Sequence, residues 1–216
     1  MKILLLGATG RTGKLILQQL VDKGYFVNAL VRNKANIQLS SALLTVFEGD
    51  VANKQLLTEA MSGCQAIISA LNISRNTDFP WSALRTPVNF LSASIRNIIA
   101  VANVLGIKRV IVLSAWGVGD SSKEIPGWFR WLIHNSNIGP AYKDHEKQER
   151  LLKDSNLDWT AIRPVGLTNF GLKHARVSID NIPKPWLLIS RRTVAAFVVN
   201  ALEHQLFIRQ TPVIFG

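Results

Sequence analysis

Three glycines close to the start of the chain have the spacing of a loop that binds phosphate groups. Gly7 can make a sharp turn, Gly10 lets the backbone approach a diphosphate, and Gly13 lets a following helix pack closely on a strand. The free N–H groups and the positive dipole end of that helix would attract the phosphates of a dinucleotide. The alternative is a turn with a structural role only. The loop residues predicted to hold a dinucleotide are Gly7, Thr9, Gly10, Arg11, Thr12 and Gly13.

A basic residue follows the stretch that predicts the second strand. Sites selective for NAD usually carry an acid about 20 residues beyond the glycine loop, where it bonds the ribose 2′-hydroxyl. Arg32 holds this position, with Asn33 and Lys34 beside it. Because a guanidinium cannot accept the hydroxyl proton but pairs well with a 2′-phosphate, we expect NADP(H) as the cofactor. Arg11 and Lys34 are further candidates for the same phosphate, and a solvated basic surface is the alternative.

Two later strand ends supply further candidates for cofactor contacts. Asp50 and Val51 follow the third predicted strand, where they would meet the adenine or form an ordinary turn. Ala70, Leu71 and Asn72 follow the fourth strand and are expected to run beneath the ribose. These positions matter because ligands of open α/β sheets bind at the carboxyl ends of the strands.

Catalytic candidates follow the fifth predicted strand and open the helix predicted over 142–154. Ser114 would lie beside the nicotinamide, where it either donates a hydrogen bond to a carbonyl or flavin or caps a turn. Tyr142 is a candidate general acid, but Glu146 stands where a Lys would lower the pKa of the tyrosine, and packing is the alternative. We expect His145 to be exposed. A solvated face is predicted for the charged residues Asp144, Glu146, Lys147, Glu149, Arg150 and Lys153.

Aromatic residues of the long connections would suit a planar electron acceptor. Hydride transfer to a flavin or quinone needs ring stacking and an organised pocket more than a strong acid, because the acceptor is already electrophilic. For each aromatic residue, a loop folded onto the core is the alternative. An acidic group on the acceptor would meet Arg75, Arg130 or Lys173. The aromatic candidates are Trp116, Trp128, Phe129, Trp131, Phe170 and Trp186.

The elements that must position these residues alternate along the chain. Short apolar runs between amphipathic stretches predict a doubly wound parallel α/β sheet, in one domain over 1–216 with a small C-terminal substrate region. Two long connections, 72–87 and 115–141, follow strands and are expected to border the ligand. Strands are predicted over 2–6, 26–31, 43–47, 66–70, 109–113, 159–162 and 212–215. Helices are predicted over 12–22, 54–61, 88–105, 142–154 and 191–202, the last capped by Ser190.

Composition excludes several classes of protein. The 216 residues are 48% apolar and 18% charged, which is too apolar for a disordered chain. The net charge is +11, but the basic residues are scattered and form no recognition motif, so we expect no nucleic acid partner. We expect no metal site and no membrane helix. Cys64 is the only cysteine, which suits a reducing cytoplasm, and we expect it to be a small buried residue.

Several motifs occur together in this chain: the glycine loop, Arg32, Gly49-Asp50-Val51, Ser114-Ala115, Asp144-His145 and the run from Ser155 to Pro164. With them the chain resembles, over nearly its whole length, the atypical short-chain dehydrogenase/reductases, close to the NmrA-like and biliverdin reductase B-like (flavin reductase) groups. The resemblance implies a Rossmann sheet ordered 3-2-1-4-5-6-7 and NADPH as cofactor.

The resemblance also implies roles for single residues. Pro164-Val165-Gly166 would form a loop beside the nicotinamide, and His145 would be a candidate proton donor. Val165 stands where the biliverdin reductase B pattern has His, so activity on tetrapyrroles does not follow from the resemblance.

Together these features predict an NADPH-dependent oxidoreductase that transfers hydride to a flavin, a quinone or a similar planar acceptor, as a monomer or homodimer. One alternative is a non-catalytic NADP-sensing regulatory protein, which the missing Tyr-x-x-x-Lys pattern favours. The other is an NADP-dependent carbonyl reductase that uses Tyr142.

Overall fold

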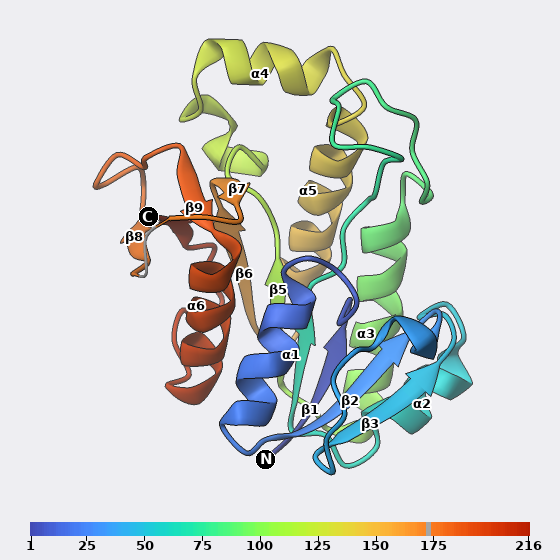
Figure 1. Ribbon diagram of the computed structural model, residues 1–216. Helices are drawn as coiled ribbons and strands as arrows, with labels where there is room; N and C mark the ends of the chain where they lie inside the picture. The colour runs from blue at the N-terminus through green and yellow to red at the C-terminus, as the bar shows by residue number, and fades with distance from the viewer. Residues whose placement is uncertain (172–173) are drawn as a thin grey trace.

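The computed structural model describes residues 1–171 and 174–216. An eight-stranded sheet lies at its centre in the order β3-β2-β1-β4-β5-β6-β10-β8, and every strand except β8 runs parallel to its neighbours (Figure 1). The strands are β1 (Lys2–Leu6), β2 (Phe26–Val31), β3 (Leu44–Glu48), β4 (Ala66–Ser69), β5 (Arg109–Leu113), β6 (Asp158–Pro164), β8 (Arg176–Ser178) and β10 (Val213–Phe215).

The first strand shows why the central strands are apolar throughout instead of alternating. Ile3 and Leu5 belong to the core on one face of the sheet, and Leu4 and Leu6 belong to the core on the other face. All four side chains are buried. A strand that is covered on both faces has no position left for a polar side chain.

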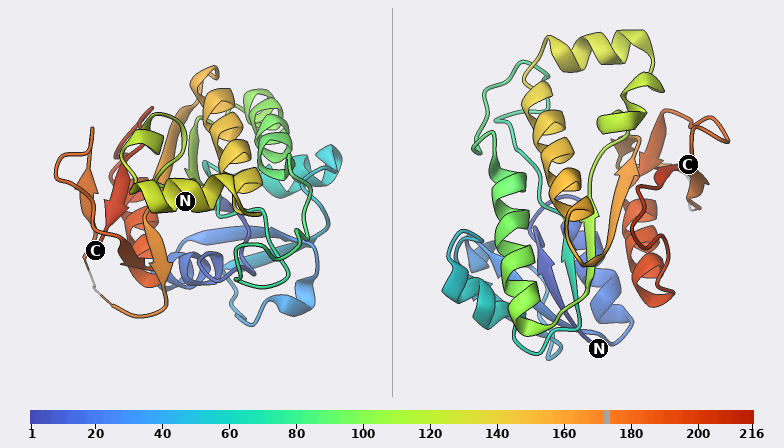
Figure 2. Two further views of the ribbon diagram at one scale, coloured as in Figure 1. Left: turned by 90° about the horizontal axis from the view of Figure 1, so that it is seen from above. Right: turned by 180° about the vertical axis from the view of Figure 1, so that it is seen from behind.

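Helices cover both faces of the sheet, as Figure 2 shows from above and behind. α1 (Gly13–Asp22) and α6 (Arg191–Glu203) pack together over one face. α2 (Lys54–Met61), α3 (Phe90–Leu105) and α5 (Gly139–Lys153) cover the other face. As predicted, Ser190 caps α6: its hydroxyl oxygen accepts a hydrogen bond from the backbone N–H of Thr193 at 3.1 Å. This three-layer arrangement confirms the predicted doubly wound α/β fold.

The predicted strand order is also confirmed, since 3-2-1-4-5-6-7 corresponds to β3-β2-β1-β4-β5-β6-β10. The structure adds β8 at the edge and a separate parallel pair, β7 (Gly166–Thr168) with β9 (Leu188–Ser190). Each of these three strands has only three residues, which is too short for a periodic pattern to show.

The long connection after β5 contains structure that the sequence did not predict. It forms the 3₁₀ turn η2 (Gly119–Lys123) and the helix α4 (Gly127–His134), at the upper end of the molecule in Figure 1. A second 3₁₀ turn, η1 (Lys34–Asn36), follows β2. α5 begins at Gly139 instead of Tyr142, with Pro140 in its first turn, where proline needs no N–H partner.

Candidate active site

A cleft of about 1120 Å³ opens at the carboxyl ends of the strands. It crosses the point where the strand order reverses, between β1 and β4, which is where open α/β sheets bind ligands. Its walls come from the glycine loop, the ends of β2 to β6 and the connection 72–87. The cleft is larger than the roughly 300 to 1,000 Å³ of ordinary small-ligand pockets, which suits a ligand as long as a dinucleotide.

Two glycines of the loop are required by geometry. Gly7 has φ +79°, and a Cβ there would lie 2.7 Å from the carbonyl oxygen of Ala70. A Cβ on Gly13 would lie 1.9 Å from the carbonyl oxygen of Gly7. Gly13 is buried and is not a lining residue of the cleft, so the structure shows a packing role for it, and its contact with a cofactor stays a prediction. Gly7, Thr9, Gly10, Arg11 and Thr12 do line the cleft.

The start of α1 is prepared for an anion. Within the described chain, Thr12 makes no side-chain capping bond, and no acid occupies the first helical turn. The N-terminal N–H groups and the positive dipole end therefore face the cleft without a protein anion of their own helix. Together with the glycine cradle, this arrangement fits the diphosphate of a nicotinamide dinucleotide.

A carboxylate from the connection 72–87 lies against the glycine loop. Both oxygens of Asp78 accept hydrogen bonds from Arg11 at 2.8 Å, and the Arg11 guanidinium lowers the pKa of the Asp78 carboxyl. Arg191, which the sequence analysis missed, also lines the cleft and donates to Asn169 at 2.7 Å. Its place directly after Ser190, in the first turn of α6, was the signal available. A phosphate bound in this part of the cleft would therefore compete with Asp78 for Arg11.

The basic residues after β2 have different positions. Arg32 is exposed, lines the cleft and pairs with no carboxylate among the described residues. Lys34 faces Glu48 at 4.0 Å. The Asn33 side chain accepts a hydrogen bond from the N–H of Ala35 and caps η1, and Asn33 is not a lining residue. The guanidinium of Arg32 is thus the one of these groups that is available to an anionic ligand in the cleft.

The other predicted cofactor contacts lie along the floor of the cleft. Asp50, Val51, Ala70, Leu71 and Asn72 all line it. The carboxylate of Asp50 also accepts a hydrogen bond from Ala52 at 2.8 Å, so the residue forms a turn as well as part of the cleft wall.

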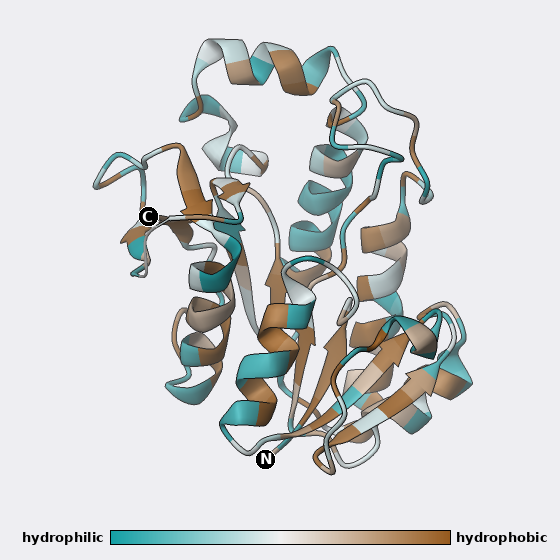
Figure 3. Ribbon diagram, viewed as in Figure 1, coloured by the Kyte–Doolittle hydropathy of each residue, from teal (hydrophilic) through white to brown (hydrophobic). Residues whose placement is uncertain are grey.

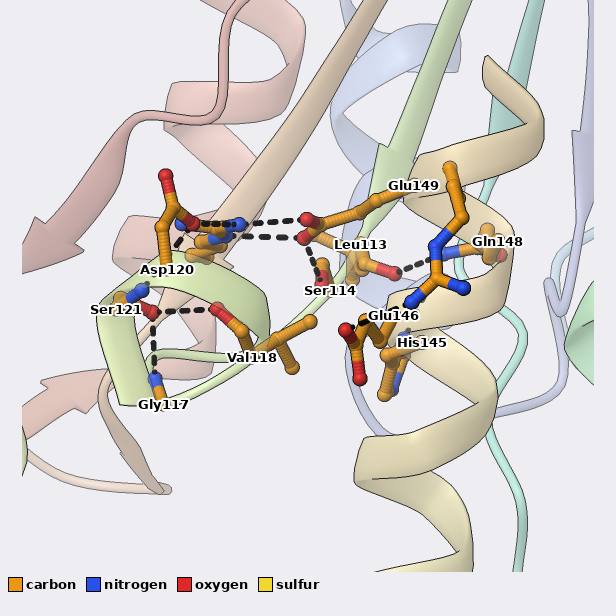
Figure 4. A network of polar contacts seen from close by, with 12 residues as sticks. Leu113, Ser114, Gly117, Val118, Asp120, Ser121, His145, Glu146, Gln148 and Glu149 are labelled. Atoms are coloured by element: carbon orange, nitrogen blue, oxygen red, sulfur yellow. Dashed lines mark hydrogen bonds and ion pairs between the residues drawn. The ribbon is translucent and has the colours of Figure 1, made fainter. Parts of the chain in front are cut away.

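The end of the cleft near β5 contains a buried polar network (Figure 4). The Ser114 hydroxyl donates to Glu149 at 2.6 Å. Glu149 accepts two further bonds from Arg163, at 3.0 and 2.6 Å, and Arg163 also meets Asp120 at 2.6 Å. Glu149 and Arg163 are each only 2% exposed. Because the hydroxyl has one proton and Glu149 receives it, the lone pairs of the Ser114 oxygen are left to face the cleft.

The predictions of a solvated face on α5 and of an exposed His145 were wrong for the buried residues Asp144, His145 and Glu149, although the helix is largely hydrophilic in Figure 3. His145 itself lines the cleft at 3% exposure, and burial lowers its pKa to about 4. The imidazole is therefore neutral at pH 7. The amide nitrogen of Gln148 donates to the carbonyl oxygen of Leu113 and lies 3.5 Å from Nδ1 of His145, which leaves the ring proton on Nε2.

Two acids of α5 are buried because they bind other elements. Asp144 accepts hydrogen bonds from the N–H groups of Leu91 and Ser92, at 2.6 and 3.3 Å, and so caps α3. Glu149 binds Arg163 on β6. The prediction was right for the remainder of the face: Lys147 and Lys153 are exposed, and Glu146 forms an i,i+4 pair with Arg150 at 2.9 Å.

Tyr142 has the packing role that was the alternative to acid catalysis. It packs edge-on against Phe129, with ring centroids 6.2 Å apart, and burial raises its pKa. It lines a second hollow of about 350 Å³ between η2, α4 and α5, and not the main cleft.

The residues expected to hold a planar acceptor are dispersed. Trp116 is buried in the core, as the alternative predicted, whereas Trp128, Trp131, Phe170 and Trp186 are exposed; none of these lines the main cleft. Arg75 lines the cleft, and Arg130 lines the second hollow. Lys173 lies outside the described residues. Pro164 and Leu167 line the cleft, whereas Val165 is buried and is not a lining residue.

Other features bear on the classes of protein considered. Among the described residues, no cluster of three His, Cys, Asp or Glu side chains is arranged to hold a metal. No helix in the described parts of the chain is long and apolar enough to cross a membrane. Cys64 is buried, as predicted, and burial raises the pKa of its thiol to about 11.

A family model described as NAD(P)H-binding matches residues 7–205. The chain belongs to this family. Sanguinarine reductase from Eschscholzia californica is 28% identical over 236 residues, which cover 93% of this chain and 84% of that protein. These matches confirm the resemblance to the atypical short-chain dehydrogenase/reductases, a family of NAD(P)H-binding oxidoreductases.

Solved structures confirm the Rossmann fold. ChuY, an anaerobillin reductase from Escherichia coli O157:H7, has a TM-score of 0.80 at 22% identity, covering 100% of this chain and 97% of that one. A short-chain dehydrogenase/reductase from Veillonella parvula in complex with NADP has a TM-score of 0.78 at 19% identity, covering 100% and 94%.

Proposed function

We propose that the protein is an NADPH-dependent reductase of conjugated planar small molecules, which accept hydride without help from a general acid. The chemistry available beside Ser114 carries this proposal. The Ser114 hydroxyl already donates its proton in a hydrogen bond to Glu149, and Tyr142 lines another hollow. His145 is neutral, and the N–H of a neutral imidazole is a very weak acid. Flavins, quinones and iminium ions take hydride at an already electrophilic atom, so they suit this site best.

Different residues of the cleft would bind different parts of the cofactor. The amides of the glycine loop and the start of α1 would hold the diphosphate, and Arg32 would pair with the 2′-phosphate. Bound NADPH supplies the hydride. Ser114 and His145 would border the reacting end, with Ile73, Phe90 and Leu167 as apolar walls that exclude water. The single buried Cys64 suits a cytoplasmic location.

The names of the relatives support a reductase and widen the choice of acceptors. One relative is named a sanguinarine reductase, and ChuY is named an anaerobillin reductase. The experiment follows NADPH oxidation with FMN, menadione, sanguinarine and biliverdin, against simple aldehydes and ketones as controls. We expect turnover of at least one conjugated acceptor and none of the simple carbonyl compounds. Preferential reduction of simple ketones contradicts the proposal, and tight NADPH binding without any turnover favours an NADP sensor instead.

A further inference from the structure

The network beneath Ser114 is more elaborate than a capped turn requires. Glu149 accepts three hydrogen bonds, one from Ser114 and two from Arg163, and both charged side chains are buried. Burying an ion pair gives little net stability compared with apolar residues of similar volume. A role in orienting the one cleft residue that the pair contacts, Ser114, explains its presence better than stability does.

The orientation imposed on Ser114 has a direct chemical consequence. Its hydroxyl proton points at Oε1 of Glu149, which lies 2.6 Å from Oγ, while the residue itself lines the cleft. The lone pairs of Oγ are therefore the groups left for a ligand. The carboxamide of a nicotinamide carries an N–H₂ group, which is a donor that such an oxygen accepts.

The surrounding backbone leaves room for the pair. Gly119 has φ +56°, and a Cβ there would lie 3.4 Å from Nη2 of Arg163 and 4.0 Å from Oε2 of Glu149. The next residue, Asp120, binds the same Nη2 from the other side. The turn η2 is thus arranged around the Arg163 guanidinium, which in turn is fixed on Glu149.

We propose that Glu149 and Arg163 are positioning residues: Glu149 fixes the hydroxyl of Ser114 so that its oxygen accepts the nicotinamide carboxamide, and Arg163 fixes Glu149. The carboxamide contact holds the ring in one orientation toward the acceptor. This inference rests on the proposed function, because it places the nicotinamide beside Ser114. Neither Glu149 nor Arg163 is a lining residue of the cleft, so both would act only through Ser114.

The test compares Glu149→Gln with Glu146→Gln on the same helix. Glu146 pairs with exposed Arg150 and has no contact with Ser114 in the described network, so its variant is the control. Three quantities are measured: the NADPH dissociation constant by calorimetry, the fluorescence lifetime of bound NADPH without acceptor, and kcat. The lifetime reports how firmly the ring is held, and it does not depend on turnover.

For Glu149→Gln we expect the dissociation constant to change by less than about tenfold, since one hydrogen bond at most is lost. The lifetime should shift toward that of free NADPH, and kcat should fall about 10- to 100-fold, as expected for a slightly misplaced reacting group. Ser114→Ala should reproduce both changes. In the Ser114→Ala background, Glu149→Gln should add nothing, because its effect passes through the hydroxyl.

Other outcomes overturn the inference. If the Glu149→Gln protein has the same NADPH lifetime and kcat as the Glu146→Gln control, Glu149 does not position Ser114. Additive effects of Ser114→Ala and Glu149→Gln show that Glu149 does not act through Ser114. If the single variant does not fold, Glu149→Gln with Arg163→Gln removes both buried charges together, and the same shift in lifetime is expected.

The proposed function and the positioning role fail in different ways. If the natural chain binds NADPH but reduces no acceptor, the proposed reductase activity fails, and the lifetime still decides on positioning. If the natural chain turns over and Glu149→Gln leaves it unaltered, only positioning fails. A chain that binds no NADPH overturns both.

Discussion

The two ends of the cleft are built in different ways. At the end proposed to bind the nucleotide, called here the nucleotide end, the cleft is lined by backbone amides and exposed side chains such as Arg32, on loops that follow β1 and β2. At the reacting end, Ser114 and His145 are buried and held by side chains of α5 and β6. The first end recognises charge, which exposed groups can do. In the proposed complex the second would fix the direction of a proton and of the nicotinamide ring, which requires groups held rigidly in place.

The nucleotide end should fail first when its backbone is disturbed. We expect Gly13→Ala to abolish NADPH binding and to lower the free energy of unfolding by about 3 kcal/mol, because the new Cβ would lie 1.9 Å from the carbonyl oxygen of Gly7. Calorimetry and denaturant unfolding measure both. Gly127→Ala is the control, since Gly127 has an ordinary backbone conformation and nothing lies within 4 Å of a Cβ added there. Equal results for the two variants would remove the steric explanation.

The reacting end should respond to pH through His145. Its pKa is about 4 in the fold against an ordinary value of 6.5, so the folded state binds the proton less readily than the unfolded state. Stability is full above about pH 6.5 and falls by about 3 kcal/mol as the pH drops to about 4. His145→Gln should lose this component in unfolding measured across that window. The control, exposed His134→Gln, should keep it; if His145→Gln keeps it too, the histidine is not neutral in the fold.

Charge recognition at the nucleotide end predicts a change in cofactor preference. We expect Arg32→Glu to raise the NADPH dissociation constant about 10- to 100-fold, because charged hydrogen bonds worth about 1.5 to 3 kcal/mol are lost. The NADH constant should hardly change. Lys34→Glu, which removes a neighbouring cation, is the matched control for charge alone. Parallel losses of NADPH and NADH affinity in Arg32→Glu would contradict selection by the 2′-phosphate.

The smallest effect concerns Asp78, which is paired with Arg11 and would compete with a bound phosphate for it. Asp78→Asn frees the guanidinium and should tighten NADPH binding about two- to fivefold, since exposed ion pairs are worth up to about 1 kcal/mol. Asp22→Asn at the far end of α1 controls for the loss of one negative charge. Weaker binding in Asp78→Asn would show instead that the connection 72–87 clasps the bound cofactor.

The lining residues of the nucleotide end were easier to predict from the sequence than those of the reacting end. The glycine loop and Arg32 lie within one continuous βαβ unit, so their spacing alone predicted their place. The acids of α5 follow a helical pattern typical of a solvated face, and only the packing shows otherwise. Glu149 is buried because Arg163 on strand β6 neutralises it, and Asp144 is buried because it caps α3. Such pairings depend on tertiary contacts that a local pattern does not contain.

The same limit explains the short elements. α4 contains aromatic residues that indicated a ligand pocket, yet Trp128 and Trp131 face outward and Tyr142 packs on Phe129 from α5. Three-residue strands such as β8 exist only because a neighbouring strand pairs with them. The long periodic elements, in contrast, were predicted to within a few residues.

The central claim is that hydride transfer from NADPH to the acceptor in this site needs no general acid. It is tested most directly by single-turnover rates of hydride transfer from bound NADPH to an accepted quinone or flavin between about pH 6 and pH 9, in water and in heavy water. The account predicts a flat pH profile and a solvent isotope effect close to one, because the pKa of His145 is about 4 and the Ser114 proton stays on its bond to Glu149. A rate that falls with rising pH, together with a large solvent isotope effect, would contradict it.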